Sequence, residues 1–251
     1  MKVLITGASS GIGRELARQL APDCSCLILT GRDTRRLEAL KEELSVYPSL
    51  QVETVAADLR DREACFRLHD GHPDVDLLVN NAGFGDFGPF WETALEKELG
   101  MIETNITALH ILTKLYLKDM VRRDSGQILN VASIAGFLPG PLMATYYATK
   151  AYVVRLSEAL RKELSARSSK VRVNILCPGP VETGFRKAAN ISFSFRGMDA
   201  RRVAAYTLAH LDRFYIVPGG PVRAVRVLAS ALPASLLSEA VYLLQSRREK
   251  G

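Results

Sequence analysis

Three side chains that can move a proton lie close together in the sequence. Lys150 follows Tyr146 by four residues, so both would project from one face of a helix. A free tyrosine has a pKa near ~10, and a nearby ammonium group favours the phenolate and lowers that pKa. Ser133 lies thirteen residues before Tyr146 and carries a hydroxyl that can hold an oxygen atom in place. Together these residues are suited to proton transfer to or from the oxygen of a ketone or an alcohol.

A second tyrosine stands directly after the first and is a rival for the proton-transfer role. Four residues after Tyr147 comes Ala151, which carries no charge, whereas four residues after Tyr146 comes Lys150. Any one of these residues alone is more often a packing or surface residue. We therefore expect Tyr146 to be the acid/base, because it is the tyrosine that has a lysine partner.

A glycine-rich turn precedes this group by more than a hundred residues. Residues 6–13 read TGASSGIG, between an apolar run and an amphipathic stretch. Glycines permit a tight turn and let the backbone approach a pyrophosphate, while the N-terminus of the next helix supplies free N–H groups. The position of this turn favours a dinucleotide site over a merely flexible turn. The residues expected to contact the cofactor are Gly7, Ser9, Ser10, Gly11, Ile12 and Gly13.

The residue after the second apolar run indicates which dinucleotide binds. Arg32 stands 21 residues after Gly11, where an acidic residue would accept the ribose hydroxyls of NAD and an arginine would meet the extra phosphate of NADP. The planar guanidinium matches phosphate in charge and geometry. Asp33 is acidic and adjacent, but it precedes a helix starting at Thr34 and is interpreted as the N-cap. NADP(H) is therefore favoured over NAD(H).

The elements that would position these residues follow a regular order. The expected strands are Lys2–Thr6, Cys26–Thr30, Gln51–Ala56, Val75–Val79, Gln127–Val131 and Val171–Cys177. The expected helices are Ile12–Leu20, Thr34–Ser45, Arg62–His69, Phe90–Arg122 and Thr145–Ser165. Continuous apolar strands are typical of a parallel sheet covered on both faces. The alternation predicts one α/β domain over residues 1–251, with a Rossmann-type doubly wound parallel sheet.

The last third of the chain departs from this alternation. Residues 184–198 have loop character with several aromatic side chains, and they follow a strand end, where ligands bind in open α/β sheets. We expect a helix at Asp199–Leu211, a short strand at Phe214–Val217 and two further helices. Residues 184–251 would then form a substrate lid and a C-terminal cap. The alternatives are an ordinary surface connection for the lid, and helices that rest on a membrane surface.

Composition excludes several classes of function. The net charge is +6 with a pI near 9.2, but the basic pairs are scattered and no aromatic residues interleave with them, which argues against nucleic-acid binding. The cysteines and histidines form no disulfide framework and no metal-ligand spacing. No apolar stretch is long and uninterrupted enough to span a membrane. The first strand begins almost at Met1, so we expect no signal peptide and a cytoplasmic protein.

With these motifs in order, residues 1–185 resemble the classical short-chain dehydrogenase/reductase family. The matching segments are the turn at 6–13, Asp58-Leu59, residues 80–83 (NNAG), Asn105, the Ser133–Tyr146–Lys150 group, and residues 178–183 (PGPVET). The resemblance implies catalytic roles for Asn105, Ser133, Tyr146 and Lys150, without a metal. It implies cofactor contacts for Asp58, Leu59, Asn81, Ala82, Gly83, Tyr146, Lys150, Pro178, Gly179, Val181 and Thr183.

Some of these roles have a simpler interpretation from the residues alone. Asn80 and Asn81 could be amides at a strand end that satisfy backbone groups, and Asn105 could be a polar residue within a helix. In the family pattern, Asn81 would lie along the ribose, and Asn105 would anchor a water that relays protons through Lys150 to Tyr146.

The sequence thus predicts an NADP(H)-dependent oxidoreductase acting on a hydrophobic ketone or secondary alcohol. The expected substrate pocket is apolar and comprises Phe84, Phe137, Leu138, Pro139 and the Phe185–Met198 segment. The C-terminal part resembles bacterial general reductases, 3-oxoacyl reductases and 17β-hydroxysteroid dehydrogenases, so a homodimer is preferred to a tetramer. The alternative from another class is a non-catalytic NADP-binding sensor or scaffold on the same fold.

Overall fold

The central feature of the fold is a parallel sheet. The computed structural model describes residues 1–185 and 197–246, and within them seven strands pair in the order β3-β2-β1-β4-β5-β6-β9, each pair parallel. The strands are β1 (Lys2–Thr6), β2 (Cys26–Gly31), β3 (Gln51–Ala56), β4 (Leu77–Asn80), β5 (Gln127–Val131), β6 (Arg172–Leu176) and β9 (Tyr215–Ile216). This is the predicted Rossmann-type doubly wound sheet in a single domain.

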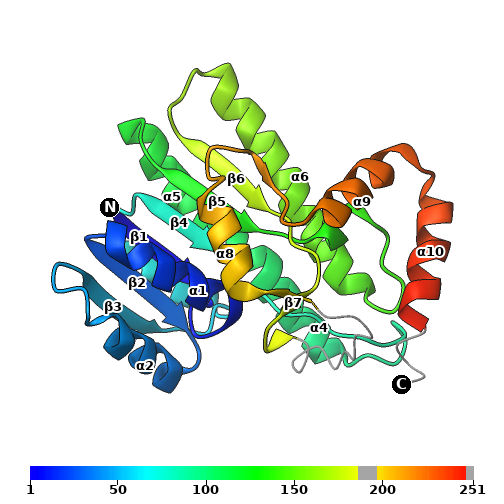
Figure 1. Cartoon of the computed structure of the whole chain (residues 1–251), viewed down its shortest axis with the longest axis horizontal. Coiled ribbons are helices and arrows are strands. Elements are labelled where there is room, and N and C mark those ends of the chain that lie inside the picture. Colours follow the sequence, from blue (N-terminus) through cyan, green and yellow to red (C-terminus); the bar gives the residue numbers. More distant parts are fainter. Residues whose placement is uncertain (186–196, 247–251) are drawn as a thin grey trace.

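Helices cover both faces of the sheet (Figure 1). They are α1 (Gly11–Leu20), α2 (Thr34–Leu44), α3 (Arg62–Gly71), α4 (Leu95–Ile102), α5 (Leu109–Arg123), α6 (Ala144–Ala166), α8 (Ala200–Leu208), α9 (Gly220–Ala231) and α10 (Ala234–Ser246). Helices α1, α2 and α8 pack on one face, while α3, α5 and α6 pack on the other.

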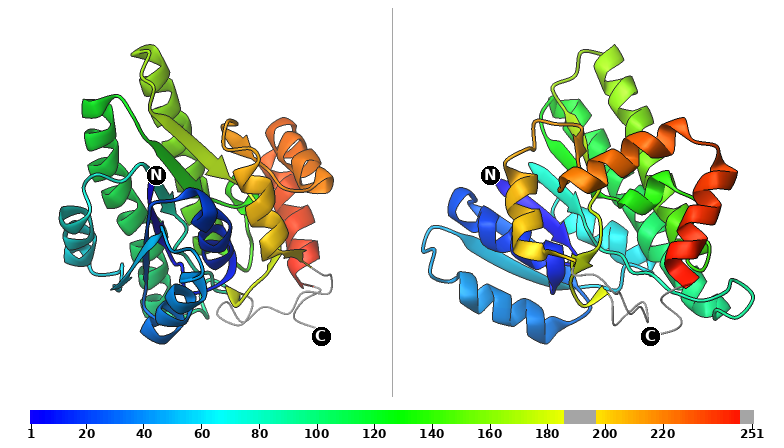
Figure 2. Two further views of the ribbon diagram at one scale, coloured as in Figure 1. Left: turned by 60° about the vertical axis from the view of Figure 1, so that its left-hand side comes forward. Right: turned by 45° about the vertical axis from the view of Figure 1, so that its right-hand side comes forward.

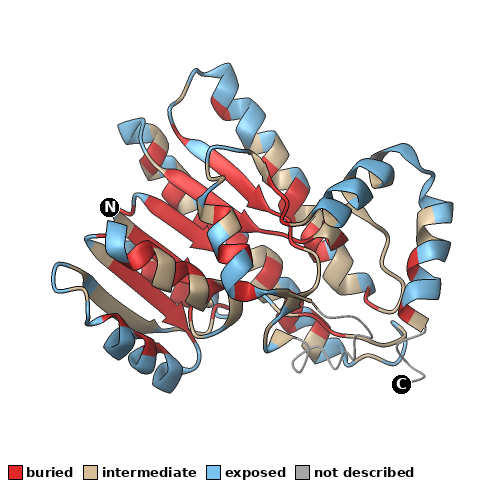
Figure 3. Cartoon of the chain, in the orientation of Figure 1, coloured by how far each residue is buried: buried red, intermediate tan, exposed pale blue. Residues whose placement is uncertain are grey.

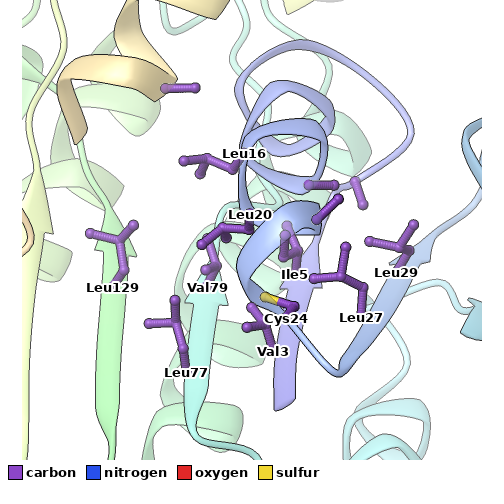
Figure 4. Packing of buried hydrophobic residues seen from close by; sticks show 14 of the residues in the cluster. Val3, Ile5, Leu16, Leu20, Cys24, Leu27, Leu29, Leu77, Val79 and Leu129 are labelled. Atoms are coloured by element: carbon purple, nitrogen blue, oxygen red, sulfur yellow. The ribbon is translucent and has the colours of Figure 1, made fainter. Parts of the chain in front are cut away.

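The two faces share strands whose side chains alternate. Val3 and Ile5 of β1 point toward α1, and Figure 4 shows them beside Leu16 and Leu20 of that helix. Leu4 points to the opposite face, toward α3 and α5. Because both directions end in apolar layers, β1, β2 and β4 are nearly continuous apolar runs, and the central strands appear wholly buried in Figure 3. The core therefore fixes the strand register and, with it, the strand ends that carry the site.

The long predicted helix at 90–122 is shorter at its start and irregular in its middle. It begins at Leu95, because residues up to Ala94 form a turn region in which Phe90 and Trp91 are exposed. Between α4 and α5 the helix widens into a π segment at Glu103–Ala108. Such π segments are rare and often occur at functional sites. This one contains Asn105.

The C-terminal part lies at the β6–β9 edge of the sheet. Residues 198–199 form β8, which pairs with β7 (Val181–Glu182) in a small second sheet that the sequence did not predict. Asp199 ends that strand and caps α8 by accepting a hydrogen bond from the Arg201 amide. Beyond β9, α9 and α10 extend from the side of the molecule (Figure 2). Most of their surface is exposed.

Candidate active site

A cavity of about 520 Å³ runs along the carboxyl ends of the strands. It spans the point where the strand order reverses, between β1 and β4, which is where open α/β sheets bind ligands. The predicted site residues that line it are Gly7, Ser9, Ser10, Gly11, Ile12, Arg32, Asp58, Leu59, Asn81, Ala82, Gly83, Ser133, Tyr146, Lys150, Pro178, Gly179, Val181 and Thr183. Two predicted residues do not line it, namely Gly13 and Asn105.

The glycine-rich turn touches the loops that follow β4 and β6. Gly7 and Gly11 both have positive φ, +66° and +55°, which side-chain-bearing residues rarely adopt. A Cβ on Gly7 would lie 2.9 Å from the Cα of Ala82, and a Cβ on Gly11 would lie 2.9 Å from the Thr183 side chain. The turn is therefore held between two predicted cofactor segments, and its close approach requires glycine.

Gly13 stays behind the cavity and supports the turn. A Cβ there would lie 2.5 Å from Asn81 Nδ2 and 2.6 Å from the Gly7 carbonyl oxygen. Asn81 Nδ2 donates to the Thr6 carbonyl at 2.9 Å, so this amide is used to hold the turn. The simpler interpretation of Asn81 thus describes its side-chain bonds, although the residue also borders the cavity.

Basic side chains gather at the far end of the cavity, after β2. Arg32 lines it as predicted, and Arg36 from the first turn of α2 lines it too, which the sequence interpretation missed. Asp33 accepts a hydrogen bond from the Arg36 amide at 3.0 Å, so it is the N-cap that the sequence predicts. Arg36 stands in the first turn of the helix that Asp33 caps, and this position could have revealed the second arginine.

Asp58, which the family resemblance assigns to the adenine, is engaged by a neighbouring residue. Arg60 donates to it from its backbone amide at 3.1 Å and from its guanidinium, which together hold the Asp58 pKa below its usual range. Leu59 beside it is buried and borders the cavity. This end therefore offers a polar rim and an apolar floor.

Proton-transfer residues meet at the other end. Ser133 follows β5, where its Oγ accepts from the Ala135 amide at 3.2 Å. Tyr146 and Lys150 project from α6 into the same space, with Lys150 Nζ 5.9 Å from the centroid of the Tyr146 ring. Lys150 Nζ also donates to the Val131 carbonyl at 2.8 Å. The structure thus brings the three predicted side chains together.

Burial perturbs the titration of this group. Contrary to the lowering expected from the Lys150 ammonium, burial raises the pKa of the Tyr146 phenol above its ordinary value, while a hydrogen bond with Ser133 opposes the rise. Burial also lowers the pKa of the Lys150 ammonium to about 8. A phenol that keeps its proton and an ammonium that can lose one near neutral pH are typical of a proton-transfer site.

Asn105 lies just outside the cavity wall, in the π segment. Its side chain brackets Phe84, accepting from that residue's amide at 3.1 Å and donating to its carbonyl at 2.9 Å. Gly83 separates it from Lys150, because a Cβ there would lie 2.9 Å from Asn105 Oδ1 and 3.5 Å from Lys150 Nζ. Asn105 therefore shapes the loop after β4 from behind.

The substrate end differs in part from the predicted pocket. Phe84 and Phe185 line the cavity as expected, together with Met143 and Tyr147. Phe137 does not, because its ring packs against Tyr215 near Arg226 of α9. Leu138 and Pro139 are likewise absent from the lining. Of the expected lid, residues 186–196 lie outside the described residues, and Met198 contacts Gly219 instead.

Residues 1–185 and 197–246 contain no group of three or more histidine, cysteine or acidic side chains placed to hold a metal ion. Among the helices described in those ranges, none is long and apolar enough to cross a membrane.

Comparisons with known proteins agree with this fold. The sequence model described as short chain dehydrogenase matches residues 1–192. The NADP-dependent 3-hydroxy acid dehydrogenase YdfG of Salmonella typhi is 38% identical over 186 residues, covering 72% of this chain and 73% of that protein. The chain therefore belongs to the short-chain dehydrogenase family and is an oxidoreductase that acts on CH–OH groups.

Two solved structures extend the likeness over nearly the whole chain. A short-chain dehydrogenase from Sphingobium yanoikuyae, in complex with NADPH, is 31% identical with a TM-score of 0.84 and covers 94% of this chain and 95% of that one. The bulky-bulky ketone specific alcohol dehydrogenase from Comamonas testosteroni is 26% identical with a TM-score of 0.79, covering 92% and 91%.

Proposed function

We propose that this chain is an NADP(H)-dependent oxidoreductase that interconverts a hydrophobic ketone and a secondary alcohol, with Tyr146 as acid/base. One observation carries the proposal: Ser133, Tyr146 and Lys150 open into the same cavity as the glycine-rich turn. A proton donor and a phosphate-binding turn in one cavity allow a carbonyl to be protonated beside a bound nicotinamide.

The residues present fit a phosphorylated dinucleotide. Gly7 and Gly11 give the turn its positive φ angles and its close approach to Ala82 and Thr183, at the N-terminus of α1, whose free N–H groups attract phosphate. Arg32 and Arg36 border the other end and suit the extra phosphate of NADP. NAD would favour an acidic residue there, but Asp33 already caps α2 and pairs with Arg36 at 3.2 Å. NADP(H) is therefore the cofactor that fits this chain, as in the Sphingobium relative.

The catalytic residues divide the proton chemistry among them. When bound, the nicotinamide supplies or accepts the hydride. In reduction, Tyr146 gives its phenolic proton to the carbonyl oxygen, and its raised pKa keeps that proton available at neutral pH. Ser133 donates a hydrogen bond to the same oxygen and orients it. The Lys150 ammonium grips the ribose and stabilises the phenolate that Tyr146 becomes. Oxidation runs these steps in reverse.

Asn105 supports this group from behind the cavity wall. Its side-chain bonds fix Phe84 and the loop after β4, and only Gly83 separates it from Lys150. The narrow space that Gly83 leaves suits a water that passes protons between solvent, Lys150 and Tyr146. In this role Asn105 is a positioning residue, since it touches neither substrate nor cofactor.

A neutral, hydrophobic substrate suits the substrate end of the cavity. Phe84, Met143, Tyr147 and Phe185 supply its lining, and Lys150 is the only cation among the described residues there. A 3-hydroxy acid, the substrate named for the Salmonella relative, would need a further cation for its carboxylate. The ketone specificity named for the Comamonas relative matches the lining better.

The decisive experiment follows NADPH oxidation across a panel of ketones that includes steroids and 3-oxoacyl thioesters. We expect turnover with at least one hydrophobic ketone, and none with that ketone in a Tyr146→Phe variant that still binds NADPH. Tight NADPH binding without turnover on any carbonyl would favour the sensor or scaffold. Full activity in Tyr146→Phe would overturn the acid/base assignment.

The assembly proposed with this function is a cytoplasmic homodimer. The helix that leads to Asn105 carries Leu95, Leu99 and Ile102 at helical spacing, and all three are exposed in the monomer. An apolar stripe of this kind is typical of a helix–helix interface. Light scattering should give twice the monomer mass, and Leu99→Glu should reduce it. A tetramer would indicate a second interface.

A further inference from the structure

A single buried amide joins the C-terminal helix to the catalytic helix. Gln245 of α10 is 1% exposed, and its Nε2 donates to the Tyr147 hydroxyl at 3.2 Å, across 98 residues of sequence. Its Oε1 is buried and accepts no hydrogen bond from the described residues. An unpaired buried oxygen costs about 1–3 kcal/mol, so stability alone would favour an apolar residue here. Stability therefore does not explain the Gln245 side chain, and we look for its role in function.

Helix α10 has few other anchors. Of its residues Ala234–Ser246, the buried ones are Val241 and Gln245, four apart and thus on one face. Leu236, Leu243 and Leu244 are exposed. A helix with so little buried apolar surface is weakly held. The hydrogen bond from Gln245 to Tyr147 therefore contributes much of the interaction that holds α10 against the domain.

The ring at the other end of this bond is confined on several sides. A Cβ on Gly140 would lie 2.0 Å from Cγ of Tyr147, so the ring lies flat over the Gly140 backbone. Its edge meets the catalytic ring, with 6.1 Å between the centroids of Tyr146 and Tyr147 and 77° between their planes. With the hydroxyl held by Gln245, the ring stands as a fixed wall of the cavity.

The loop beneath the ring is itself fixed. Leu142 has a positive φ of +64°, which costs a residue with a side chain about 1–2 kcal/mol. Its carbonyl accepts from the Gly88 amide at 2.9 Å, and the Met143 amide donates to the Gly140 carbonyl at 3.0 Å. Strain of this kind persists where the surroundings hold it, often beside functional sites. The loop therefore gives Tyr147 a firm base.

We propose that Tyr147 and Gln245 determine substrate size. Tyr147 is the specificity-determining contact for the substituent that lies beyond the reacting carbonyl. Gln245 is a positioning residue that fixes the angle of the Tyr147 ring. This inference rests on the proposed function and names the part of the cavity that selects the ketone. It also gives α10 a role, since the helix carries the group that holds the wall.

The test removes the bond from each side without removing bulk. Gln245→Met keeps the length of the side chain, Tyr147→Phe keeps the ring, and the double variant completes a cycle. The readout is the ratio of kcat/KM for benzophenone to that for acetophenone, two ketones that differ in one substituent. Each single variant should raise this ratio by about tenfold, the scale on which pocket shape discriminates. The double variant should match the singles, because all three lack the bond between Gln245 and Tyr147.

A neighbouring substitution separates position from stability. Leu244→Met places the same new side chain on the exposed neighbour of Gln245 and should leave the ratio unchanged. NADPH affinity should stay constant throughout, since the bond lies away from the cofactor end. A lower melting temperature with an unchanged ratio in Gln245→Met and Tyr147→Phe would overturn the inference, and so would additive effects in the double variant.

Failure of the proposed function would look different. If the wild-type enzyme reduced neither ketone, the proposed function would be in doubt. The selection of substrate size would then be measured from the binding of the two ketones. Calorimetry would then compare the dissociation constants of benzophenone and acetophenone in the same variants. If the ratio of the two dissociation constants changes in the variants, Tyr147 and Gln245 select substrate size. If the ratio stays constant, the inference is wrong, whether or not the enzyme turns over.

Discussion

The two ends of the cavity are built in different ways. At the cofactor end, backbone meets backbone: the Gly7 turn touches Ala82, and Gly13 lies against the Gly7 carbonyl. At the substrate end, side chains meet side chains from distant segments, as when Tyr147 of α6 bonds Gln245 of α10. A backbone contact tolerates almost no change in residue type, whereas a side-chain wall can be rebuilt by single substitutions. The difference indicates that the cofactor end tolerates fewer substitutions than the substrate end.

The largest effect should come from breaking the backbone contacts of the cofactor end. In Gly13→Ala the new methyl group would lie 2.6 Å from the Gly7 carbonyl oxygen, so the turn must shift. Because misplacement by about 1 Å can cost 100-fold, we expect NADPH affinity to fall by about that factor. Fluorescence titration with NADPH measures the loss.

Gly71→Ala is the matched control, because a Cβ at Gly71 has no atom within 4 Å. It should bind NADPH as the wild type does. If Gly13→Ala also bound NADPH with wild-type affinity, the turn would tolerate a side chain at this position. The proposed difference between the two ends of the cavity would then be wrong.

A smaller effect should follow from the charged rim of the same end. Replacing Arg32 and Arg36 by alanine removes the cations that would meet the extra phosphate of NADP. Hydrogen bonds to charged groups contribute about 1.5–3 kcal/mol, so NADPH affinity should fall about 10- to 100-fold. NADH affinity should stay unchanged in the same titration. Arg35→Ala, on the same helix but outside the cavity lining, is the control. Equal losses of affinity for NADPH and NADH would mean that these arginines do not bind the extra phosphate of NADP.

The cofactor end could be predicted because its signals are local. The turn at 6–13 and the Asp33 N-cap each occupy a few consecutive residues, and the structure forms both where the sequence predicts them, although Gly13 lies behind the cavity. The sheet followed from apolar runs whose side chains meet helices on both faces. In each case a short sequence pattern determines the local structure without reference to distant residues.

The substrate end could not be predicted because its contacts are not local. Phe137 follows Ser133 closely, yet its ring turns toward Tyr215, a residue from the last strand. The π segment around Asn105 has no sequence signal of its own within a helical stretch. Gln245 carries no motif, and its significance appears only when α10 is seen against Tyr147. Side-chain packing between remote segments decides all three.

A moderate effect should connect the two ends through Lys150. Burial lowers its pKa to about 8, so the ammonium is present below that pH and is lost above it. In the proposed role the charged form would hold the cofactor ribose, so NADPH binding should weaken by about fivefold as the pH rises through about 8. The affinity of Lys150→Arg should not change over the same range, because arginine keeps its charge. A flat profile in the wild type would show that the ammonium does not contribute to binding.

The smallest effect should come from α10, whose docking is slight. Val241 is one of its buried residues, and Val241→Ala removes two methyl groups from a small contact, so the free energy of unfolding should fall by about 1–2 kcal/mol. Leu244→Ala, exposed on the same helix, should change it by less than about 0.5 kcal/mol. NADPH affinity should be unaltered in both variants, since no residue of α10 lines the cofactor end. Urea unfolding and NADPH titration measure the two quantities. A loss of NADPH binding in Val241→Ala would mean that the two ends are coupled through α10, because damage to the substrate wall would then reach the cofactor site.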